Sequence, residues 1–464
     1  MDDRTLAARL WSDLGGDPSS MASVVIGGPQ AVLPSTFDVT GFASATVAVA
    51  ATAVAELAMV RQGLGSVPPV AVDRLAASAA FRFEGLVRPD GWELPPIWDP
   101  VAGDYRATNG WIRLHTNYAN HRRATLAVLE ADADRAAVAA AVERWDADEL
   151  ESAVVAAGGC AAALRTSTAW AAHPAGVASR DERPMVIDRP VPISGGTGPD
   201  RSQPVGASPL AGLRVLDLTR VIAGPLGTRY LAGYGADVVR IDPPGFEEVP
   251  ALLPEVTAGK RCAALDLADG ADRARFEALV ARADVVVGGL RPGALAELGY
   301  GAAGLRAINP GLVTVAHDAY GWSGPWAGRR GFDSLVQMST GIAAAGAAAA
   351  GVDRPTPLPA QALDHGVGHL VAAAACRGLV RRIVEGVGSE ARGSLVGAAN
   401  VVSALAAPEV AAPAVTVADA DLVDGDTAWG PLRRVPLAGR IGGYEQGWSI
   451  EAGPLGRHLP EFAT

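Results

Sequence analysis

Between residues 213 and 318, short apolar strands alternate with segments long enough to form a helix, and this alternation constrains the fold more than any other feature. The expected strands are LRVLDL (213–218), ADVVRID (236–242), CAALDL (262–267), DVVVGGL (284–290) and LVTVAHD (312–318). Strands joined through helices need right-handed crossovers and lie parallel in one sheet. Ligands of such sheets bind at the carboxyl ends of the strands. The sequence therefore predicts an α/β domain with a ligand site at that edge.

One of the intervening segments has a clear helical pattern. The stretch GADRARFEALVARA (270–283) places Phe276, Leu279 and Val280 on one stripe of a helix. We expect this stripe to pack on the sheet.

A smaller α+β module is expected before this sheet. Residues 104–116 (DYRATNGWIRLHT) alternate around Asn109-Gly110, which is a strong turn signal for a β-hairpin. Three helices and a short strand are expected to follow, at 121–131, 135–145, 147–157 and 160–166. Residues 181–208 are rich in Pro, Gly, Ser and charge, and we expect a linker there.

Charge and cysteine content disfavour several classes of protein. Lys and Arg number 39 against 50 Asp and Glu, a net charge of −11, and there is no basic block, so we expect neither nucleic acid nor a membrane as partner. Cys160, Cys262 and Cys376 lie far apart, which argues against a disulfide framework and a cysteine zinc site. The acidic N-terminus does not resemble a signal peptide, and the apolar run at 43–55 is too short to span a bilayer. We therefore expect a cytoplasmic protein.

The chain also contains a faint internal repeat. Residues 45–81 resemble residues 369–405, because each has an Ala-rich helix, a G-x-G turn, a short extended piece and a second Ala-rich helix. Two Ala-rich helices can resemble each other by coincidence. The G-x-G shared between the helices favours a true duplication.

The turn after the first strand of the sheet bears on nucleotide binding. A helix N-terminus that points into a crevice can bind an anion. However, the turn reads AGPLGT rather than G-x-G-x-x-G, so a nicotinamide dinucleotide loses its main support. Asp242 ends the second strand, where a ribose-binding acid could lie, but without the glycine pattern we do not expect a dinucleotide site.

Asp364 is the leading candidate for chemistry. It lies at the start of an Ala-rich helix in LPAQALDHGVGHLVAAAA, and one interpretation is that its carboxylate caps that helix. The other interpretation is a carboxylate nucleophile on a rigid helix end, and the two are compatible. Gly366 and Gly368 would let backbone or a ligand approach closely.

Two further clusters have more than one interpretation. His365 and His369 share a helix face, but there is no H-E-x-x-H and no third ligand, so we expect no metal site. Arg329 and Arg330 lie in a loop and are either a solvated basic spot or a phosphate contact. Neither a serine nucleophile elbow nor a phosphate-binding loop occurs.

Six segments in a fixed order resemble the family III CoA-transferases, the group that includes carnitine and formyl-CoA transferases and alpha-methylacyl-CoA racemase. The segments cover about 209–405, and PLGRH (454–458) resembles the family's closing segment. They are PLAGLRVLDLTRVIAGPLGTRYLAGYGADVVRID, GKRCAALDL, ADVVVGGLRPGALAELG, NPGLVTVAHDAYGWSGPW, GFDSLVQMSTG and LPAQALDHGVGH.

The resemblance implies a rearranged domain order. The family's order is a CoA-binding lobe, a linking helix, a small domain and a tail, whereas residues 95–175 look like that small domain placed first. The implied fold is a Rossmann-like parallel-sheet CoA-binding lobe plus a small α+β domain, in a fused and partly duplicated order. The expected parts are 1–94, which resembles the linking helices, 95–180 as the small domain, 181–208 as the linker, 209–405 as the CoA-binding lobe and 406–464 as the tail.

The resemblance also implies a reaction. In the family's transferases, the residue matching Asp364 attacks an acyl-CoA thioester and carries the acyl group and then CoA before an acceptor carboxylate takes the CoA. Acyl-CoA and a carboxylic acid would be the substrates, with no tightly bound cofactor and no metal, and the assembly would be a homodimer. CoA would lie along Val221, Ile222, Ala223, Leu265, Gly289, Leu290, Arg291 and Tyr320.

The resemblance leaves open whether the N-terminal half carries a second nucleophile. Anchoring the repeat on G-x-G sets Gly41 opposite Asp364, and a gap of a few residues would bring Asp38 there instead.

Two other functions remain as alternatives. The racemases carry a His-Asp pair where this chain has Phe332-Asp333, and a phenyl ring cannot move a proton, so an acyl-CoA racemase or epimerase is the second hypothesis. A CoA-binding paralogue that has lost catalysis is the third.

Overall fold

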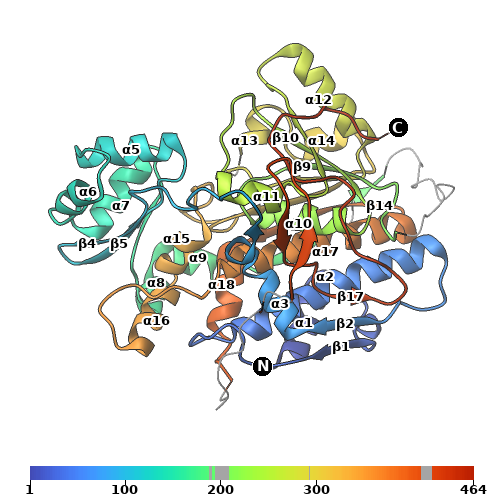
Figure 1. Ribbon diagram of the computed structural model, residues 1–464, viewed down its shortest axis with the longest axis horizontal. Coiled ribbons are helices and arrows are strands. Elements are labelled where there is room, and N and C mark those ends of the chain that lie inside the picture. The colour runs from blue at the N-terminus through green and yellow to red at the C-terminus, as the bar shows by residue number, and fades with distance from the viewer. Residues whose placement is uncertain (188–190, 194–207, 292, 409–417, 419–420, 464) are drawn as a thin grey trace.

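The centre of the molecule is one mixed β-sheet (Figure 1). The computed structural model describes residues 1–187, 191–193, 208–291, 293–408, 418 and 421–463. Six parallel strands run in the order β11-β10-β9-β12-β13-β14, and β7 and β8 pair antiparallel with β14. The strands are β7 Met185–Ile187, β8 Val191–Pro192, β9 Arg214–Leu218, β10 Asp237–Asp242, β11 Lys260–Ala264, β12 Val285–Gly288, β13 Val313–Asp318 and β14 Val387–Ser394.

The parallel sheet confirms the expected fold class. All five strands expected from the sequence form, and the third, β11, begins two residues earlier than expected. After β9 the chain adds β10 and β11 on one side of β9, and it later adds β12, β13 and β14 on the other side. The order of strands therefore reverses between β9 and β12, and such a switch point opens a crevice at the carboxyl ends of the strands.

Helices cover both faces of this sheet. On one face Leu216 and Val239 share a core with α12, whose buried residues are the expected stripe Phe276, Leu279 and Val280. On the other face α17 packs against β13 and β14, and α10 packs on α17. The helices of this part are α10 Ala223–Gly233, α11 Leu253–Val256, α12 Gly270–Arg282, α13 Ala294–Glu297, α14 Ala302–Ile308, α15 Asp333–Ser339, α16 Ile342–Ala350, α17 Ala362–Glu385 and α18 Leu395–Ser403, with a 3-10 turn η2 at Pro250–Leu252.

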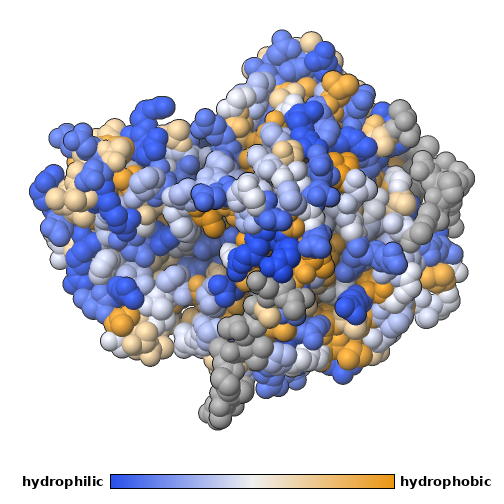
Figure 2. Space-filling model, in the orientation of Figure 1, coloured by the Kyte–Doolittle hydropathy of each residue, from blue (hydrophilic) through white to orange (hydrophobic). Residues whose placement is uncertain are grey.

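The small α+β module forms as the hairpin signal predicts. The turn at Asn109 and Gly110 joins β4 to β5, and β6 pairs with β5. The module has a hydrophobic core of its own, around Ile112, Val138 and Leu150. Its elements are β4 Gly103–Ala107, β5 Gly110–Leu114, α5 Ala119–Leu129, α6 Arg135–Val142, α7 Ala147–Ala156 and β6 Ala161–Ala163, and α8 Ser167–Ala172 and α9 Pro174–Ser179 follow. Figure 2 shows it projecting at the left, with hydrophilic side chains over much of the visible face.

The N-terminal part is more than a set of helices. Strands β1 and β2 are parallel and flank α2, and β17 from the tail pairs antiparallel with β2. The elements are α1 Asp3–Asp13, η1 Pro18–Met21, β1 Val24–Gly27, α2 Val39–Gln62, β2 Val70–Asp73, α3 Arg74–Ala80, α4 Phe83–Leu86 and β3 Arg88–Pro89. This β–α–β–α order matches β13, α17, β14 and α18, where an antiparallel β7 likewise flanks β14. The structure therefore supports the duplication.

Helix α2 is longer than its apolar run suggests. The expectation rested on residues 43–55, but the helix spans 24 residues. Among the described residues, α2 is the one helix that is long and apolar enough to span a membrane, yet 89% of its most apolar stretch is buried inside the fold. It packs lengthwise against α17 (Figure 1). Small side chains allow this contact, since a Cβ on Gly366 would come within 2.3 Å of the ring of Phe42.

The linker and the tail are ordered where they are described. Most of the expected linker, at 188–190 and 194–207, lies outside the described residues, but β7 comes from the linker and joins the main sheet. The tail forms β15 Val423–Gly425, β16 Leu432–Arg434 and β17 Arg440–Ile441. It ends beside β11, where His458 Nδ1 accepts a hydrogen bond of 3.0 Å from the N–H of Cys262.

Candidate active site

A cavity of about 370 Å³ lies at the carboxyl ends of the sheet strands, where the small module meets the lobe. Residues after β9, β12 and β13 form one wall, and the first turn of α5 from the small module forms another. Asp364 from α17 is part of the lining. The lining residues are Tyr118, Asn120, His121, Arg220, Val221, Pro243, Phe246, Gly289, Leu290, Arg291, Ala294, His317, Asp318, Ala319, Arg329, Arg330, Gly331, Phe332, Asp364 and Leu395.

Asp364 does not cap its helix. It is the third residue of α17, and the N-cap is Gln361, which makes no side-chain cap bond. The backbone N–H of Asp364 instead donates a hydrogen bond of 2.9 Å to Oδ2 of Asp333, from α15. The capping interpretation of Asp364 is therefore wrong. Its carboxyl oxygens take part in no hydrogen bond or ion pair found among the described residues.

Burial and neighbouring acids raise the pKa of Asp364. The residue is only 8% exposed, and its pKa lies well above 3.8 because of burial, the charge of Asp333 and the charge of Glu84. Burial also raises the pKa of Asp333, to about 6, although the N–H of Asp364 and the amide of Gln337 favour its anion. Burial and the negative charge of Asp333 therefore both favour the protonated form of Asp364. Its carboxylate, once formed, is poorly solvated and without a counter-ion.

The N-terminal half supports the helix that carries Asp364. His365 is fully buried, and its Nε2 donates to Oε2 of Glu84 in α4 at 3.1 Å. Phe81 stacks on both His365 and His369, with ring centroids 5.2 and 5.7 Å apart. The described residues contain no cluster of three or more potential metal ligands. The two histidines contact the ring of Phe81, and His365 also contacts Glu84.

Glycines near Asp364 make room for protein rather than for a ligand. Gly366 accommodates the ring of Phe42. A Cβ on Gly368 would lie 2.6 Å from the carbonyl oxygen of Ala223 at the start of α10. These glycines let α17 approach its two neighbouring helices closely.

A buried ionic network holds the cavity wall after β9. Val221 has a positive φ of 64°, which is strained for a β-branched residue. Its N–H donates to Oε2 of Glu248 at 3.0 Å, and Arg240 donates to the same oxygen at 2.9 Å. The other oxygen of Glu248 accepts a 2.7 Å bond from the hydroxyl of Tyr118. This carboxylate therefore ties the small module to the lobe at the cavity.

Asp242 belongs to the same network. Its carboxylate is 1% exposed and accepts hydrogen bonds from Arg240, and it forms an ion pair with Arg220 at 3.2 Å. A ribose-binding acid would need a free carboxylate, so the structure gives no support to a dinucleotide site at Asp242.

The residues expected to contact CoA fall into two sets. Val221, Gly289, Leu290 and Arg291 line the cavity together with Asp364. The other four are buried and do not line it; they are Ile222, Ala223, Leu265 and Tyr320. Leu265 lies in the core under α12, and Tyr320 hydrogen-bonds Ser339 and packs on Trp326.

Arg329 and Arg330 have different surroundings, although they are adjacent. Arg329 forms an ion pair with Glu151 at 2.8 Å and lies over the ring of Trp326. Arg330 is exposed and lines the cavity. Phe332 follows, and its ring stacks on His115 of the small module with centroids 3.6 Å apart.

Several site residues escaped the sequence analysis. Tyr118, His121, Glu84 and Glu248 lie in segments that the sequence assigns to other modules or to loops. Of these, only Glu248 has a signal, because it closely follows the second strand of a parallel sheet. The others reach the site through tertiary packing.

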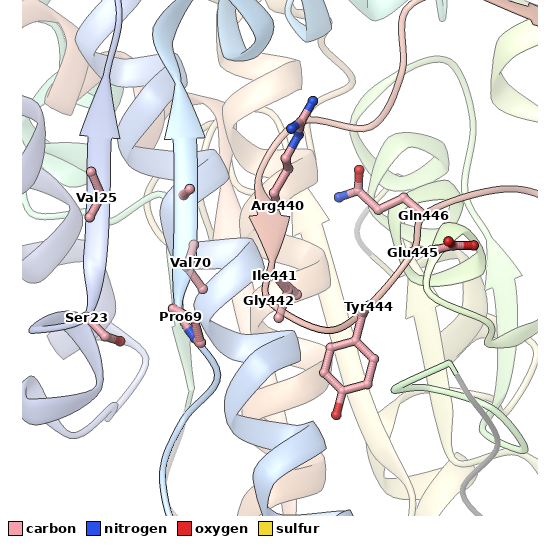
Figure 3. Close-up of a pocket in the computed structure, with 11 residues that line it drawn as sticks. Ser23, Val25, Pro69, Val70, Arg440, Ile441, Gly442, Tyr444, Glu445 and Gln446 are labelled. Atoms are coloured by element: carbon pink, nitrogen blue, oxygen red, sulfur yellow. The ribbon is translucent and has the colours of Figure 1, made fainter.

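A second cavity of about 620 Å³ opens beside the N-terminal sheet, between β1, β2 and the residues after β17 (Figure 3). Its polar side chains diverge: Tyr444 points away from Arg440, and Glu445 points to a third side. The hydroxyl of Tyr444 is already used, since it donates to Gln62 at 2.7 Å. This cavity presents no convergent set of reactive groups.

Comparisons with known proteins match the lobe rather than the whole chain. Residues 210–421 match the model of the family described as CoA-transferase family III. The chain is 35% identical over 182 residues to acetyl-coenzyme A transferase nodX of Hypoxylon pulicicidum, covering 38% of this chain and 31% of that protein. It is 34% identical over 194 residues to the probable fatty acyl-CoA transferase Rv3272 of Mycobacterium tuberculosis, covering 39% and 49%. It is 37% identical over 145 residues to acetyl-CoA:oxalate CoA-transferase of Acetobacter aceti, covering 29% and 37%.

Solved structures give similar matches. The crystal structure of Rv3272 matches with a TM-score of 0.39 at 31% identity, covering 42% of this chain and 56% of that one. A CaiB/BaiF family protein from Brucella suis matches with a TM-score of 0.37 at 25% identity, covering 48% and 65%. The chain thus spans less than half the length of the three curated relatives named above.

Proposed function

Because residues 210–421 match the model of CoA-transferase family III, we propose that this chain transfers CoA between an acyl-CoA thioester and a carboxylic acid, with Asp364 as nucleophile. The observation that carries the proposal is the carboxyl of Asp364 in the wall of a cavity that also contains Val221 and Gly289–Arg291. A carboxylate that caps its own helix would accept hydrogen bonds from backbone N–H groups. In α17 the backbone N–H of Asp364 is bound by Asp333 instead, so both carboxyl oxygens of Asp364 are left for the reaction.

In the proposed reaction, a carboxylate oxygen of Asp364 attacks the thioester carbon, and CoA leaves as the thiolate. The anhydride that forms is then attacked by this thiolate at the aspartyl carbon, which releases the first carboxylic acid. The acceptor carboxylate attacks the aspartyl-CoA thioester and expels the CoA thiolate, which leaves a second anhydride. The thiolate then attacks the acyl carbon of this anhydride, which forms the new acyl-CoA and releases the carboxylate of Asp364. Splitting one exchange into such steps is what covalent catalysis provides.

The surroundings of Asp364 fit these steps. The carboxylate is poorly solvated once it loses its proton, so little water has to be displaced when a thioester carbon approaches. The strained Val221 is held by Glu248, which fixes the wall where CoA is proposed to lie. The position tied to proton transfer in the racemases is Phe332, whose ring lines the cavity and stacks on His115. Transfer is therefore the function we favour over racemisation.

The test is an exchange assay on the wild-type chain. Acetyl-CoA, succinyl-CoA and other thioesters are incubated with carbon-labelled carboxylic acids, and label is followed into the CoA ester. We expect label transfer with ping-pong kinetics and no deuterium uptake from heavy water at the α-carbon. Deuterium uptake without label transfer would support the racemase instead. CoA binding by calorimetry without either reaction would support the inactive paralogue.

The homodimer and the cytoplasmic location expected from the sequence also stay proposals. The chain supplies its own small module, yet only one complete parallel-sheet lobe. We expect a dimer of this chain by light scattering. A stable monomer that still transfers CoA would contradict the assembly without affecting the proposed chemistry.

A further inference from the structure

The cavity is lined by one cation, Arg330, for which the described residues provide no partner. Four arginines line it, and three of them are paired: Arg220 with Asp242, Arg291 with Glu297, and Arg329 with Glu151. Arg330 takes part in no hydrogen bond, ion pair or ring contact found among the described residues. Of the four, Arg330 is the one whose charge is left for a ligand.

Two groups that feel the charge of Arg330 do not balance it. Burial, with a smaller contribution from the charge of Arg330, lowers the pKa of His121 to about 4, and burial raises the pKa of Cys160 to about 12 despite the charge of Arg330. At neutral pH the imidazole and the thiol are therefore both uncharged. Asp364 lines the same cavity, but it forms no ion pair with Arg330 among the described residues.

The place of Arg330 separates it from the proposed CoA groove. Val221 and Gly289–Arg291 follow β9 and β12, whereas Arg330 comes from the loop after β13, three residues before Asp333. The next residue but one, Phe332, stacks on the small module. Arg330 therefore comes from a different stretch of the cavity wall than Val221 and Gly289–Arg291, next to the residue that stacks on the small module.

The same wall has a second feature that favours an anion. The first turn of α5 contributes Asn120 and His121 to the lining, and its N-cap, Tyr118, makes no side-chain cap bond. The positive end of the helix dipole thus lies on the same side as Arg330. The two features together make this end of the cavity electropositive, while the end near Asp364 is acidic.

We propose that Arg330 binds a second carboxylate on the substrate, so that the acid exchanged at Asp364 is a dicarboxylic acid. One carboxylate of such an acid would take part in the exchange and the other would pair with the guanidinium. This inference rests on the proposed function for the reacting end. A guanidinium is suited to this role because it stays charged and can hold a carboxylate with two parallel hydrogen bonds.

The test compares acids that differ only in the second carboxylate. Succinate, glutarate and adipate are assayed as CoA acceptors against butyrate, valerate and hexanoate, with acetyl-CoA as the common donor. We expect the wild type to prefer at least one of the dicarboxylic acids. Arg330→Gln should lower kcat/KM for that acid by about 10- to 100-fold and change kcat/KM for its monocarboxylic partner far less. No preference in the wild type, or an equal loss with both acids, would overturn the proposal.

Two variants sharpen the result. Arg330→Glu should favour 5-aminovalerate over glutarate, because the ammonium group would meet a carboxylate. Arg291→Gln is the matched control, since it removes a cavity cation on the CoA side that is already paired with Glu297, and it should not change the preference between acids. If Arg330→Gln instead raises KM for acetyl-CoA with every acceptor, the residue binds a phosphate of CoA and the proposal fails.

A binding experiment separates this proposal from the proposed function. Glutarate and valerate are titrated by calorimetry into Asp364→Asn and into Asp364→Asn/Arg330→Gln. This measurement of binding does not require turnover. We expect glutarate to bind the first protein about 10- to 100-fold more tightly than the second. This result can hold even if the wild type transfers no CoA. Equal affinity in the two proteins would overturn the proposal even if the wild type is an active transferase.

Discussion

Helices α2 and α17 are corresponding elements of the internal repeat, but their first turns differ. Both span 24 residues and end at a left-handed glycine, Gly63 in one and Gly386 in the other. Their N-cap residues, Asp38 and Gln361, share nearly the same backbone geometry, with φ of −75° in both and ψ of 73° and 62°. The helices therefore align without a gap, and Gly41 is the counterpart of Asp364. The shifted alignment that would set Asp38 opposite Asp364 is not supported.

The difference lies in which element caps the helix. In α2, Asp38 caps its own helix by accepting the N–H of Gly41 at 2.7 Å. In α17, the corresponding N–H of Asp364 goes to Asp333, which belongs to another helix. A carboxylate that caps its own helix is occupied, whereas a helix capped from outside can present a free carboxylate at its first turn. The duplicated half thus gives the fold a supporting helix, and the other half carries the carboxyl that we propose as the nucleophile.

The largest expected difference between the two helices is in activity. Asp364→Asn should lower CoA transfer by at least about 10³-fold, because an amide cannot form the proposed intermediates. Asp38→Asn is the matched control, and it should retain transfer because Asp38 does not line the cavity. Both variants are compared with the wild type at one saturating pair of substrates. Comparable losses in the two would remove the distinction between the helices.

The second difference is in pH dependence. Transfer should fail on the acid side at a pH well above the ordinary pKa of an aspartate, because burial and Asp333 raise the pKa of Asp364. Asp333→Asn removes a negative charge but keeps an oxygen for the N–H of Asp364. The acid limb of kcat/KM, which reports the pair as a unit, should therefore move to lower pH. Movement to higher pH would show that Asp333 does not act by charge.

Asp364 and Asp333 show which parts of the site can be predicted from the sequence and which cannot. The parallel strands, the stripe on α12 and the hairpin at Asn109 were predictable because hydrophobic period and turn chemistry are local. Asp364 could be proposed from a motif, but its partner Asp333 lies 31 residues earlier and its neighbour Glu84 lies 280 residues earlier. No local pattern encodes such contacts.

The cap of α17 illustrates the same limit. From the sequence, an aspartate near a helix start is a reasonable N-cap, and only the three-dimensional contact with Asp333 shows that the helix begins two residues before Asp364. Likewise, Ile222 and Leu265 match CoA-lining motifs but are buried, because Ile222 is the N-cap residue of α10 and Leu265 packs in the core that contains α12.

A third comparison concerns the glycine opposite Asp364. A Cβ on Gly41 would lie 2.2 Å from Oδ2 of Asp38, so Gly41→Ala should destabilise the protein by about 1–3 kcal/mol. In an Asp38→Ala background the clash is gone, and the same change should cost far less or stabilise, since alanine favours a helix over glycine by about 1 kcal/mol. Thermal unfolding of the four proteins measures this. Additive effects would mean that Gly41 is not required by the cap.

The smallest expected effects have opposite signs. Asp38→Ala should lower the stability by about 1 kcal/mol through loss of the cap. Asp364→Asn should raise Tm, and more at pH 8 than at pH 5. In the folded state the pKa of Asp364 is raised, so its destabilising effect is absent at low pH and grows as the pH rises through that pKa. Tm values for both variants at the two pH values test this, and a fall in Tm for Asp364→Asn at pH 8 would argue against a buried, unpaired carboxyl.

The most direct test of the central claim is to detect the bond that Asp364 forms. Wild-type protein is incubated with acetyl-CoA, quenched in acid, digested and examined by peptide mass spectrometry. We predict a CoA or acetyl adduct on the peptide that contains Asp364, absent in Asp364→Asn and absent from the peptide that contains Asp38. An active enzyme that carries no adduct on Asp364, or carries it on another residue, would contradict the account.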